Sequence, residues 1–169
     1  MIRKALVEDA YDIEEIRIKT WRTTYKGIIS DLVLDELEVN KHLRVDNLRE
    51  NLKKDKFLVY LNREKPVGFI GYGTSRENDK YGEIFAIYIL EDYQSYGYGK
   101  ALIHKALLDM PHEKLWIWSL KENPSLDIYR HLGGKIIEDK VIKLKGQALE
   151  EVKLEYDKKA LFTRTALTL

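Results

Sequence analysis

The sequence predicts a single α/β domain with a mixed sheet, and two observations carry this prediction. Strand-like and helix-like segments alternate in the order strand, helices, three strands, helix, strand, helix and two strands. In "YQSYGYGKAL", residues 93–102, two glycines and a lysine lie where an apolar strand gives way to a helix. The 169 residues suffice to bury a sizeable core without disulfides. We expect one domain over residues 1–156 and a tail without strong pattern over 157–169.

The first third of the chain predicts a short strand followed by amphipathic helices. Residues 2–7, "IRKALV", are typical of a strand. Residues 10–20 place apolar side chains at steps of three and four, which is typical of a helix face packed on a sheet. Further helices are predicted at 32–37 and 41–54.

From Lys56 the sequence changes from helical periodicity to short apolar runs, which predict three successive antiparallel strands. They cover "FLVYL" at 57–61, "VGFIGYGTS" at 67–75 and "YGEIFAIYIL" at 81–90. Turn-like residues separate them, as in β-hairpins.

The last third predicts elements that alternate again. A helix over 98–110 is followed by a strand over 114–120, "KLWIWSL". The segment 122–134, "ENPSLDIYRHLGG", predicts a short helix that ends at a glycine. A hairpin of strands at 135–144 and 151–156 completes the sheet.

Three kinds of phosphate-binding loop could explain the glycine segment. A Walker-type loop needs a glycine at position 94 and a hydroxyl at 101, where the chain has Gln94 and Ala101. A dinucleotide fingerprint needs a third glycine at 102, which is Leu102. The remaining possibility is that backbone N–H groups at a helix N-terminus face an anion, with Gly97 and Gly99 permitting close approach. The alternative is that the two glycines only form a turn before a helix and bind no ligand.

With these residues in view, the chain resembles the GNAT superfamily of N-acetyltransferases. Gln94, Gly97 and Gly99 match its acetyl-CoA-binding signature, Q/R-x-x-G-x-G/A after a strand, and "ENPSLDIYRHLGG" matches its asparagine–tyrosine landmark. The opening segment "TWRTTYKGIISDLVLDEL" is similar to the small-molecule and polyamine branch. The resemblance implies a mixed, mostly antiparallel central sheet flanked by helices and splayed at its central parallel strands.

The resemblance also implies that acetyl-CoA is the co-substrate and which residues bind it. The pyrophosphate is expected on the amides of 95–100, and the thioester oxygen near the backbone of 87–89. The implied cofactor-binding residues are Ile87, Tyr88, Ile89, Gln94, Ser95, Tyr96, Gly97, Tyr98, Gly99, Lys100 and Asn123. For Asn123 a plain helix N-cap is an equally good interpretation.

Two catalytic residues follow from the same resemblance. Tyr129 stands at the position of the tyrosine that protonates the departing thiolate, and Glu83 at a position for the base that removes the amine's proton, directly or through water. The structural alternatives are a core aromatic for Tyr129 and a solvated strand residue for Glu83.

The acceptor is expected to be a small primary amine, with polyamines first. Trp21 and Tyr25 supply aromatic faces for the substrate, and nearby acids supply negative charge, namely Asp31, Asp35, Glu36 and Glu38. The alternative is that these acids form the solvated face of a helix and that Trp21 packs. A non-catalytic acyl-CoA-binding protein and an acetyltransferase for protein or peptide N-termini are the rival functions.

Composition limits which other partners are expected, namely nucleic acids, metal ions and membranes. The formal net charge of +1 argues against a nucleic-acid binder. There is no cysteine, and the four histidines show no ligand spacing, so no metal is expected. The N-terminus lacks a signal peptide and no apolar run is long enough for a bilayer, so a cytoplasmic protein without membrane partners is expected. A homodimer is an expectation from the superfamily alone.

Overall fold

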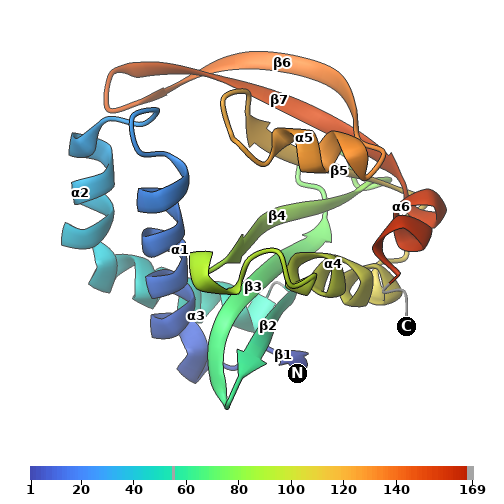
Figure 1. Ribbon diagram of the computed structural model, residues 1–169, viewed down its shortest axis with the longest axis horizontal. Helices are drawn as coiled ribbons and strands as arrows, with labels where there is room; N and C mark the ends of the chain where they lie inside the picture. The colour runs from blue at the N-terminus through green and yellow to red at the C-terminus, as the bar shows by residue number, and fades with distance from the viewer. Residues whose placement is uncertain (55, 167–169) are drawn as a thin grey trace.

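The computed structural model describes residues 1–54 and 56–166, and its centre is a seven-stranded sheet (Figure 1). The strand order is β1-β2-β3-β4-β5-β7-β6. The strands are β1 (Ile2–Lys4), β2 (Lys56–Asn62), β3 (Lys65–Thr74), β4 (Gly82–Ile89), β5 (Lys114–Leu120), β6 (Lys135–Leu144) and β7 (Gln147–Asp157). The predicted order of strands and helices along the chain is confirmed up to β7. The sheet is the mixed, mostly antiparallel one expected.

The parallel pair β4–β5 divides the sheet into two halves. Its pairing runs only from Gly82 with Leu115 to Ile84 with Ile117. Beyond that point β4 continues along β3, while β5 continues along β7. The register between β3 and β4 shifts where Gly71 and Tyr72 pair with Ala86 and Ile84, which leaves Phe85 unpaired in a bulge. Because a bulge bends the strand that carries it, this irregularity fits the separation of β4 from β5.

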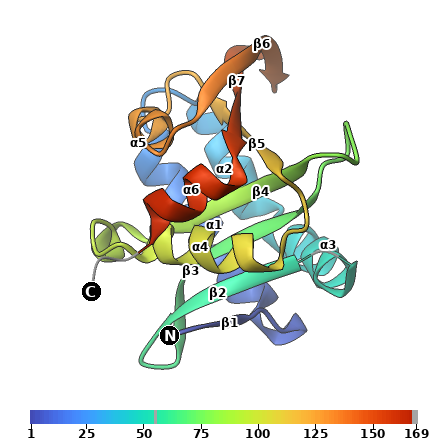
Figure 2. The ribbon, with the colours of Figure 1, turned by 90° about the vertical axis from the view of Figure 1, so that its right-hand side faces the viewer.

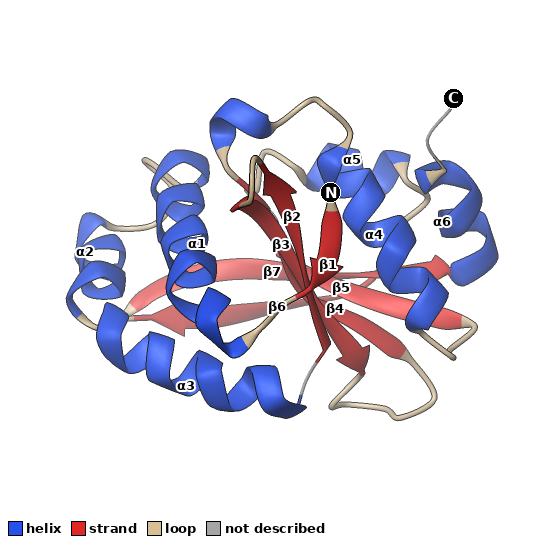
Figure 3. Ribbon diagram, turned by 90° about the horizontal axis from the view of Figure 1, so that it is seen from below, coloured by secondary structure: helices blue, strands red, loops and turns tan. Residues whose placement is uncertain are grey.

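Six α-helices and two short 3-10 helices cover the sheet in the described part of the chain. They are η1 (Val7–Asp9), α1 (Ala10–Thr24), α2 (Asp31–Val39), α3 (Lys41–Lys54), η2 (Glu91–Tyr93), α4 (Tyr98–Asp109), α5 (Leu126–His131) and α6 (Lys158–Thr165). Helices α1, α2 and α3 gather at one side of the sheet, and α4 and α6 at the other (Figure 3). Figure 2 shows α4 lying across one face of the sheet, with α6 beside it. No described helix is both long and apolar enough to cross a membrane.

The core has a separate cluster on each side of the sheet. Beneath α4 and α6, the fully buried Leu102 and Leu107 pack with Ile70 and Leu154 of the sheet. Beneath α1 and α3 the apolar stripe expected from the sequence packs against the other face, with Ile13 and Ile16 next to Phe69. A third cluster joins α1 and α2 to the ends of β5 and β7. Each face of the sheet therefore has its own helices, and the cluster under α4 and α6 contains side chains from both halves of the split sheet.

The end of the chain differs from the patternless tail expected over 157–169. Residues 158–165 form α6, and its Leu161 and Thr165 are almost completely buried against the cluster under α4. Asp157 caps this helix by accepting a hydrogen bond from the Ala160 amide at 2.9 Å. The helix therefore extends the core of residues 1–156. Residues 167–169 of the expected tail lie outside the described residues.

Candidate active site

Two cavities lie where β4 and β5 separate. The first, here the α4 cavity, has a volume of about 380 Å³ and is bounded by α1, the segment before α4 and α5. The second, here the β7 cavity, has a volume of about 350 Å³ and is bounded by α1, β4, β5, β6 and β7. Five residues line both cavities and are called the shared wall, namely Tyr25, Ile87, Tyr88, Asn123 and Tyr129. The two cavities therefore lie side by side where β4 and β5 diverge, and the shared wall lies between them.

The segment before α4 owes its shape to residues with positive φ. Gly97 has φ +80° and is the N-cap of α4, without any side-chain cap for the helix. Ser95 also lies in the left-handed region, with φ 66°. The first-turn amides of α4 therefore lack intrahelical acceptors and carry the positive end of the helix dipole. Gln94 anchors the segment to β4, since its Nε2 donates to the Ile89 carbonyl at 2.9 Å.

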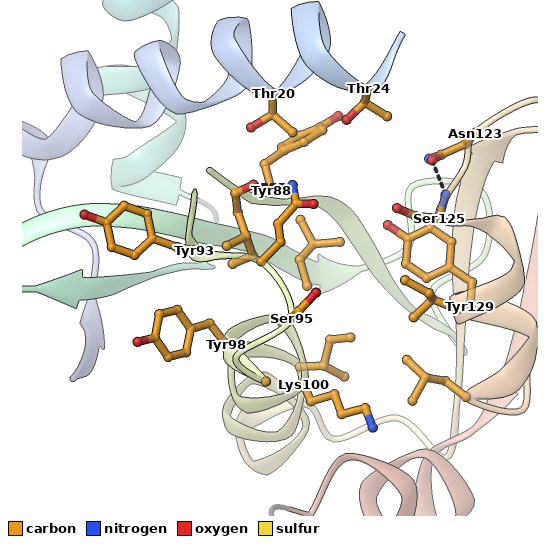
Figure 4. Close-up of a pocket in the computed structure, with 18 of the residues that line it drawn as sticks. Thr20, Thr24, Tyr88, Tyr93, Ser95, Tyr98, Lys100, Asn123, Ser125 and Tyr129 are labelled. Carbon is orange, nitrogen blue, oxygen red and sulfur yellow. Dashed lines mark hydrogen bonds between the residues drawn. The ribbon is translucent and has the colours of Figure 1, made fainter. Parts of the chain in front are cut away.

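The α4 cavity gathers nearly all residues predicted to bind acetyl-CoA. Every predicted residue lines it except Tyr96, which is 70% exposed and lies beside the ring of Tyr98. Tyr98 in turn stacks on Tyr60 of β2, with ring centroids 3.9 Å apart. In Figure 4 the walls of this cavity come from several elements, with Thr20 and Thr24 at one end, Tyr93 and Tyr98 on one side, and Asn123 and Tyr129 on another.

Two features of the α4 cavity fit a ligand with the polar groups of acetyl-CoA. The Thr20 hydroxyl is buried and has no hydrogen-bond partner among the described residues, although Thr20 lines the cavity. A Cβ added to Gly99 would meet only Ile89 Cγ1, at 4.0 Å, so the space in front of this backbone is open. An unpaired buried hydroxyl and an unobstructed stretch of amides suit a pantetheine arm and a pyrophosphate.

Tyr129 is the residue of the shared wall best placed for proton transfer. Its ring is partly buried and packs on the core under α4. Its hydroxyl makes no hydrogen bond to any other residue that the structure describes. Burial, followed by the nearby Tyr88 phenol, raises the pKa of Tyr129 well above that of an ordinary tyrosine. The phenol therefore keeps its proton at neutral pH.

Asn123 organises the neighbouring part of the wall. Its Nδ2 donates to the Tyr25 hydroxyl at 3.2 Å and to Ser119 Oγ at 3.1 Å, while its Oδ1 accepts from the Ser125 amide at 2.8 Å. The helix that follows begins at Leu126, with Ser125 as N-cap, so the alternative interpretation of Asn123 as the N-cap is wrong. Both amide hydrogens of Asn123 are thus occupied within the protein.

The β7 cavity is lined by aromatic rings and two charged side chains. The indole of Trp21 donates to the Tyr88 hydroxyl at 3.0 Å and meets the ring of Tyr25 edge-on, with centroids 5.2 Å apart. The charged residues are Arg17 of α1 and Glu151 of β7. Burial, and then the nearby Tyr88, Tyr129 and Glu151, raise the pKa of Tyr25.

Glu83 lines neither cavity. It lies at the start of β4, opposite Gly73 of β3 and Trp116 of β5. Burial is the main reason that the pKa of the Glu83 carboxyl is raised, and a hydrogen bond with Ser75 acts in the opposite direction. The structure thus brings Tyr129 to the cavities but does not bring Glu83 into contact with them.

The acids of α2 also lie outside both cavities. Asp35 forms an ion pair with Arg22 at 3.1 Å, and Glu36 with Lys145 at 2.8 Å. Neither these two nor Asp31 and Glu38 line the β7 cavity, whose carboxylate comes from Glu151.

The sequence prediction missed several lining residues. Thr20 and Thr24 lie one and two turns after Arg17 on α1, so a helical wheel aligned with Trp21 would have suggested them. Glu151 is one of three glutamates in β7, and no motif distinguishes it from the others. Tyr93 and Ser125 flank the two predicted landmarks and line the α4 cavity.

Comparison with known proteins agrees with this geometry. Residues 13–133 match the model of the Acetyltransferase (GNAT) family. The chain is 32% identical over 158 residues to the uncharacterized N-acetyltransferase YuaI of Bacillus subtilis, covering 90% of each protein.

Solved structures share the fold. The crystal structure of the PaiA N-acetyltransferase from Thermoplasma acidophilum, in complex with coenzyme A, matches with a TM-score of 0.73 and 19% identity over 93% of this chain and 98% of that one. The ribosomal-protein-alanine N-acetyltransferase of Brucella melitensis matches with a TM-score of 0.67 and 21% identity over 93% and 99%.

The residues that the structure describes contain no cluster of side chains suited to hold a metal ion. The family match spans most of the chain, and a curated relative aligns over nearly its full length. The chain therefore belongs to the GNAT family and is an acetyl-CoA-dependent N-acetyltransferase.

Proposed function

We propose that this enzyme transfers the acetyl group of acetyl-CoA directly to the primary amine of a small molecule. In this proposal acetyl-CoA occupies the α4 cavity and the acceptor enters the β7 cavity. The observation that carries the proposal is the shared wall, where the free hydroxyl of Tyr129 faces the junction of two separate compartments. Two substrates that approach from opposite sides can then meet without exchanging places.

The chemistry delivers one proton to the leaving thiolate and removes two from the acceptor nitrogen, one before attack and one after the C–N bond forms. The amine nitrogen attacks the thioester carbonyl, the new C–N bond forms and the C–S bond breaks, and CoA leaves as a thiolate. Tyr129, whose pKa is raised mainly by burial, holds the proton that this thiolate requires. Backbone N–H groups of 87–89 on the splayed part of β4 are suited to stabilise the oxyanion.

The acceptor must lose a proton before it attacks, because an alkylammonium has a pKa near 10 and is not nucleophilic. The nitrogen loses a second proton to the base or to solvent after the C–N bond forms. Glu83 is retained as the proposed base, acting through water, since it lines neither cavity. A raised carboxyl pKa makes Glu83 a stronger base than an ordinary glutamate. Under this proposal Glu83→Gln loses rate at neutral pH and recovers part of it at high pH, where more amine is already neutral.

The size of the acceptor follows from the β7 cavity, whose volume of about 350 Å³ is near the lower end for small-molecule sites. A polyamine remains a prediction from the sequence. Its supporting acids on α2 lie outside the cavity, while Trp21 and Tyr25 line it.

A direct experiment tests the function. Free CoA release is measured with acetyl-CoA and a panel of polyamines, amino sugars, amino acids and peptide N-termini. We expect turnover with at least one small amine. Release with peptides alone would favour a protein N-terminal acetyltransferase, and binding without turnover on any amine would favour a non-catalytic acyl-CoA-binding protein. The cytoplasmic location and the homodimer remain predictions that sedimentation and fractionation can test.

A further inference from the structure

The β7 cavity holds one cationic and one anionic side chain, and neither is fully neutralised by the described chain. Arg17 shares the buried carboxylate of Glu14 with Arg44. Two guanidinium groups thus face one carboxylate, whose side chain is only 2% exposed. No second carboxylate pairs with Arg17 among residues 1–54 and 56–166, so one positive charge is left over at this wall.

The guanidinium of Arg17 is also held in place before any ligand binds. Its Cζ lies 5.4 Å from the ring centroid of Phe69 and 5.7 Å from that of Tyr88. Its Nε lies 3.2 Å from Glu14 without the alignment of a hydrogen bond, and it is buried without any other partner in the described chain. A guanidinium fixed by aromatic rings and short of an acceptor is a preorganised receptor for a carboxylate.

Glu151 supplies the opposite charge near the shared wall. The nearest cation, Lys140, lies 3.6 Å from its Oε2, beyond hydrogen-bond distance, and Lys140 Nζ also lies over the ring of Trp118 at 3.8 Å. Neither Glu151 oxygen accepts a hydrogen bond from a described side chain. Glu151 is close enough to the Tyr25 phenol to influence its ionisation, together with Tyr88 and Tyr129. The Glu151 carboxylate, which has an ion pair but no side-chain hydrogen bond, is therefore near the wall at which acetyl transfer is proposed.

We propose that the acceptor is an amino carboxylate, with Arg17 binding its carboxylate and Glu151 attracting its ammonium group toward the shared wall. This inference rests on the proposed function, since it names the acceptor class of the same site. A compound with one charge of each sign complements a cavity that presents one charge of each sign. A polyamine would instead place a distal ammonium near Arg17, and a peptide N-terminus lacks the adjacent carboxylate.

The test compares each amino acid with its carboxamide, which keeps the amine and loses the negative charge. Substrates include the common L-amino acids, β-alanine and γ-aminobutyrate. We expect the wild-type enzyme to favour at least one acid over its carboxamide by about tenfold or more in kcat/KM, because an unfilled buried charge site is costly. In Arg17→Met this preference should disappear through a higher KM for the acid. Arg22→Met, which removes an exposed arginine of the same helix that pairs with Asp35, should keep the preference.

Substitution of Glu151 gives a second, independent test of the acceptor class. Glu151→Gln should raise KM for the acid and its carboxamide alike, since both carry the ammonium group. Glu150→Gln is the matched control, because the neighbouring Glu150 pairs with Lys121 and lines neither cavity. CoA affinity, measured in each variant, should stay at the wild-type value and shows that the fold is kept.

The outcomes separate this inference from the proposed function. Equal rates for acids and carboxamides, a preference for spermidine, or an unchanged preference in Arg17→Met would overturn the amino-carboxylate assignment alone. An enzyme that acetylates none of these amines contradicts the proposed function and, with it, this inference.

Discussion

The α4 cavity and the β7 cavity are built in different ways. One continuous segment, residues 94–100, supplies much of the α4 cavity, and its backbone conformation matters more than its side chains. The β7 cavity draws side chains from α1, β4, β5, β6 and β7, which are distant in sequence. Backbone amides such as those of residues 94–100, here called the backbone cradle, recognise phosphate in many ligands. Side chains from several elements can instead select one acceptor. The comparison teaches that cofactor binding and acceptor choice should be separable by mutation.

The largest effect is expected from a substitution in the backbone cradle. Gly97 lines the α4 cavity and has φ +80°, so Gly97→Val places a β-branched side chain in a conformation that it rarely adopts. We expect the Kd for CoA to rise at least about 100-fold, equivalent to about 2.7 kcal/mol. Isothermal titration with CoA measures it.

Gly146→Val is the matched control for that variant. Gly146 has φ +81° in the turn between β6 and β7, and a Cβ added there would meet no atom within 4 Å. Both variants should lose stability from the same backbone strain, about 1–2 kcal/mol. If Gly146→Val weakened CoA binding as much as Gly97→Val, the loss would reflect strain and the cradle assignment would fail.

The next largest effect is expected from a substitution in the shared wall. Tyr129→Phe keeps the packed ring and removes the hydroxyl that lacks a partner in the described chain. We expect kcat to fall about 100-fold, within the usual range for general acid–base groups, with little change in the Kd for CoA. Steady-state rates of CoA release measure it. Wild-type turnover would show that water or another group protonates the thiolate.

A smaller effect concerns the orphan hydroxyl of the α4 cavity. Thr20→Val is nearly isosteric and removes a buried hydroxyl without a described partner, so the free protein should become slightly more stable. If that hydroxyl binds the pantetheine arm, the Kd for CoA should rise about three- to tenfold. Thr165→Val, which removes a buried hydroxyl that donates to Leu161 O at 2.9 Å, should lose stability and keep CoA affinity. Unchanged CoA affinity in Thr20→Val would exclude this contact.

The smallest effect concerns Glu83, outside both cavities. Its folded-state pKa is raised, mainly by burial, so the folded protein binds more protons than the unfolded chain between the ordinary and the raised pKa. The contribution of Glu83 to stability is therefore fully present below the ordinary glutamate pKa and is lost as pH rises through the raised one. Glu83→Gln does not titrate, so its stability relative to wild type should increase between about pH 4 and about pH 7. Urea unfolding at both pH values checks this, and a relative decrease would contradict the burial argument.

The comparison of cavities also explains what the sequence could predict. The segment 94–100 of the α4 cavity could be predicted, because its glycines, Gln94 and the preceding strand are contiguous and each has a local physical reason. Thr20 and Thr24 line the same cavity but come from a distant helix, and they were not predicted. Arg17 and Glu151 were not predicted, because α1 and β7 meet only through the tertiary fold and neither residue belongs to a periodic pattern. For the same reason the acids of α2 were predicted near the substrate, yet they line neither cavity, and two of them, Asp35 and Glu36, pair with Arg22 and Lys145.

The succession of strands and helices along the chain followed from alternating patterns, whereas α6 did not. Leu161 is the main buried apolar residue of α6, and one apolar anchor in eight residues is a weak helical signal. The Asp157 cap was a usable signal that the sequence prediction passed over. The bulge at Phe85 and the end of β4–β5 pairing after Ile84 depend on packing and leave no simple trace in sequence.

A crystal structure of the enzyme with bound coenzyme A tests the central claim most directly. We predict that the pyrophosphate lies on the amides of 95–100, that the pantetheine arm follows β4 from Ile89 to Ile87, and that the sulfur reaches the shared wall within hydrogen-bond distance of the Tyr129 hydroxyl. The β7 cavity should stay open for the acceptor. Coenzyme A bound with its sulfur away from Tyr129, or with its pantetheine arm filling the β7 cavity, would contradict the account of two substrates that meet across one wall.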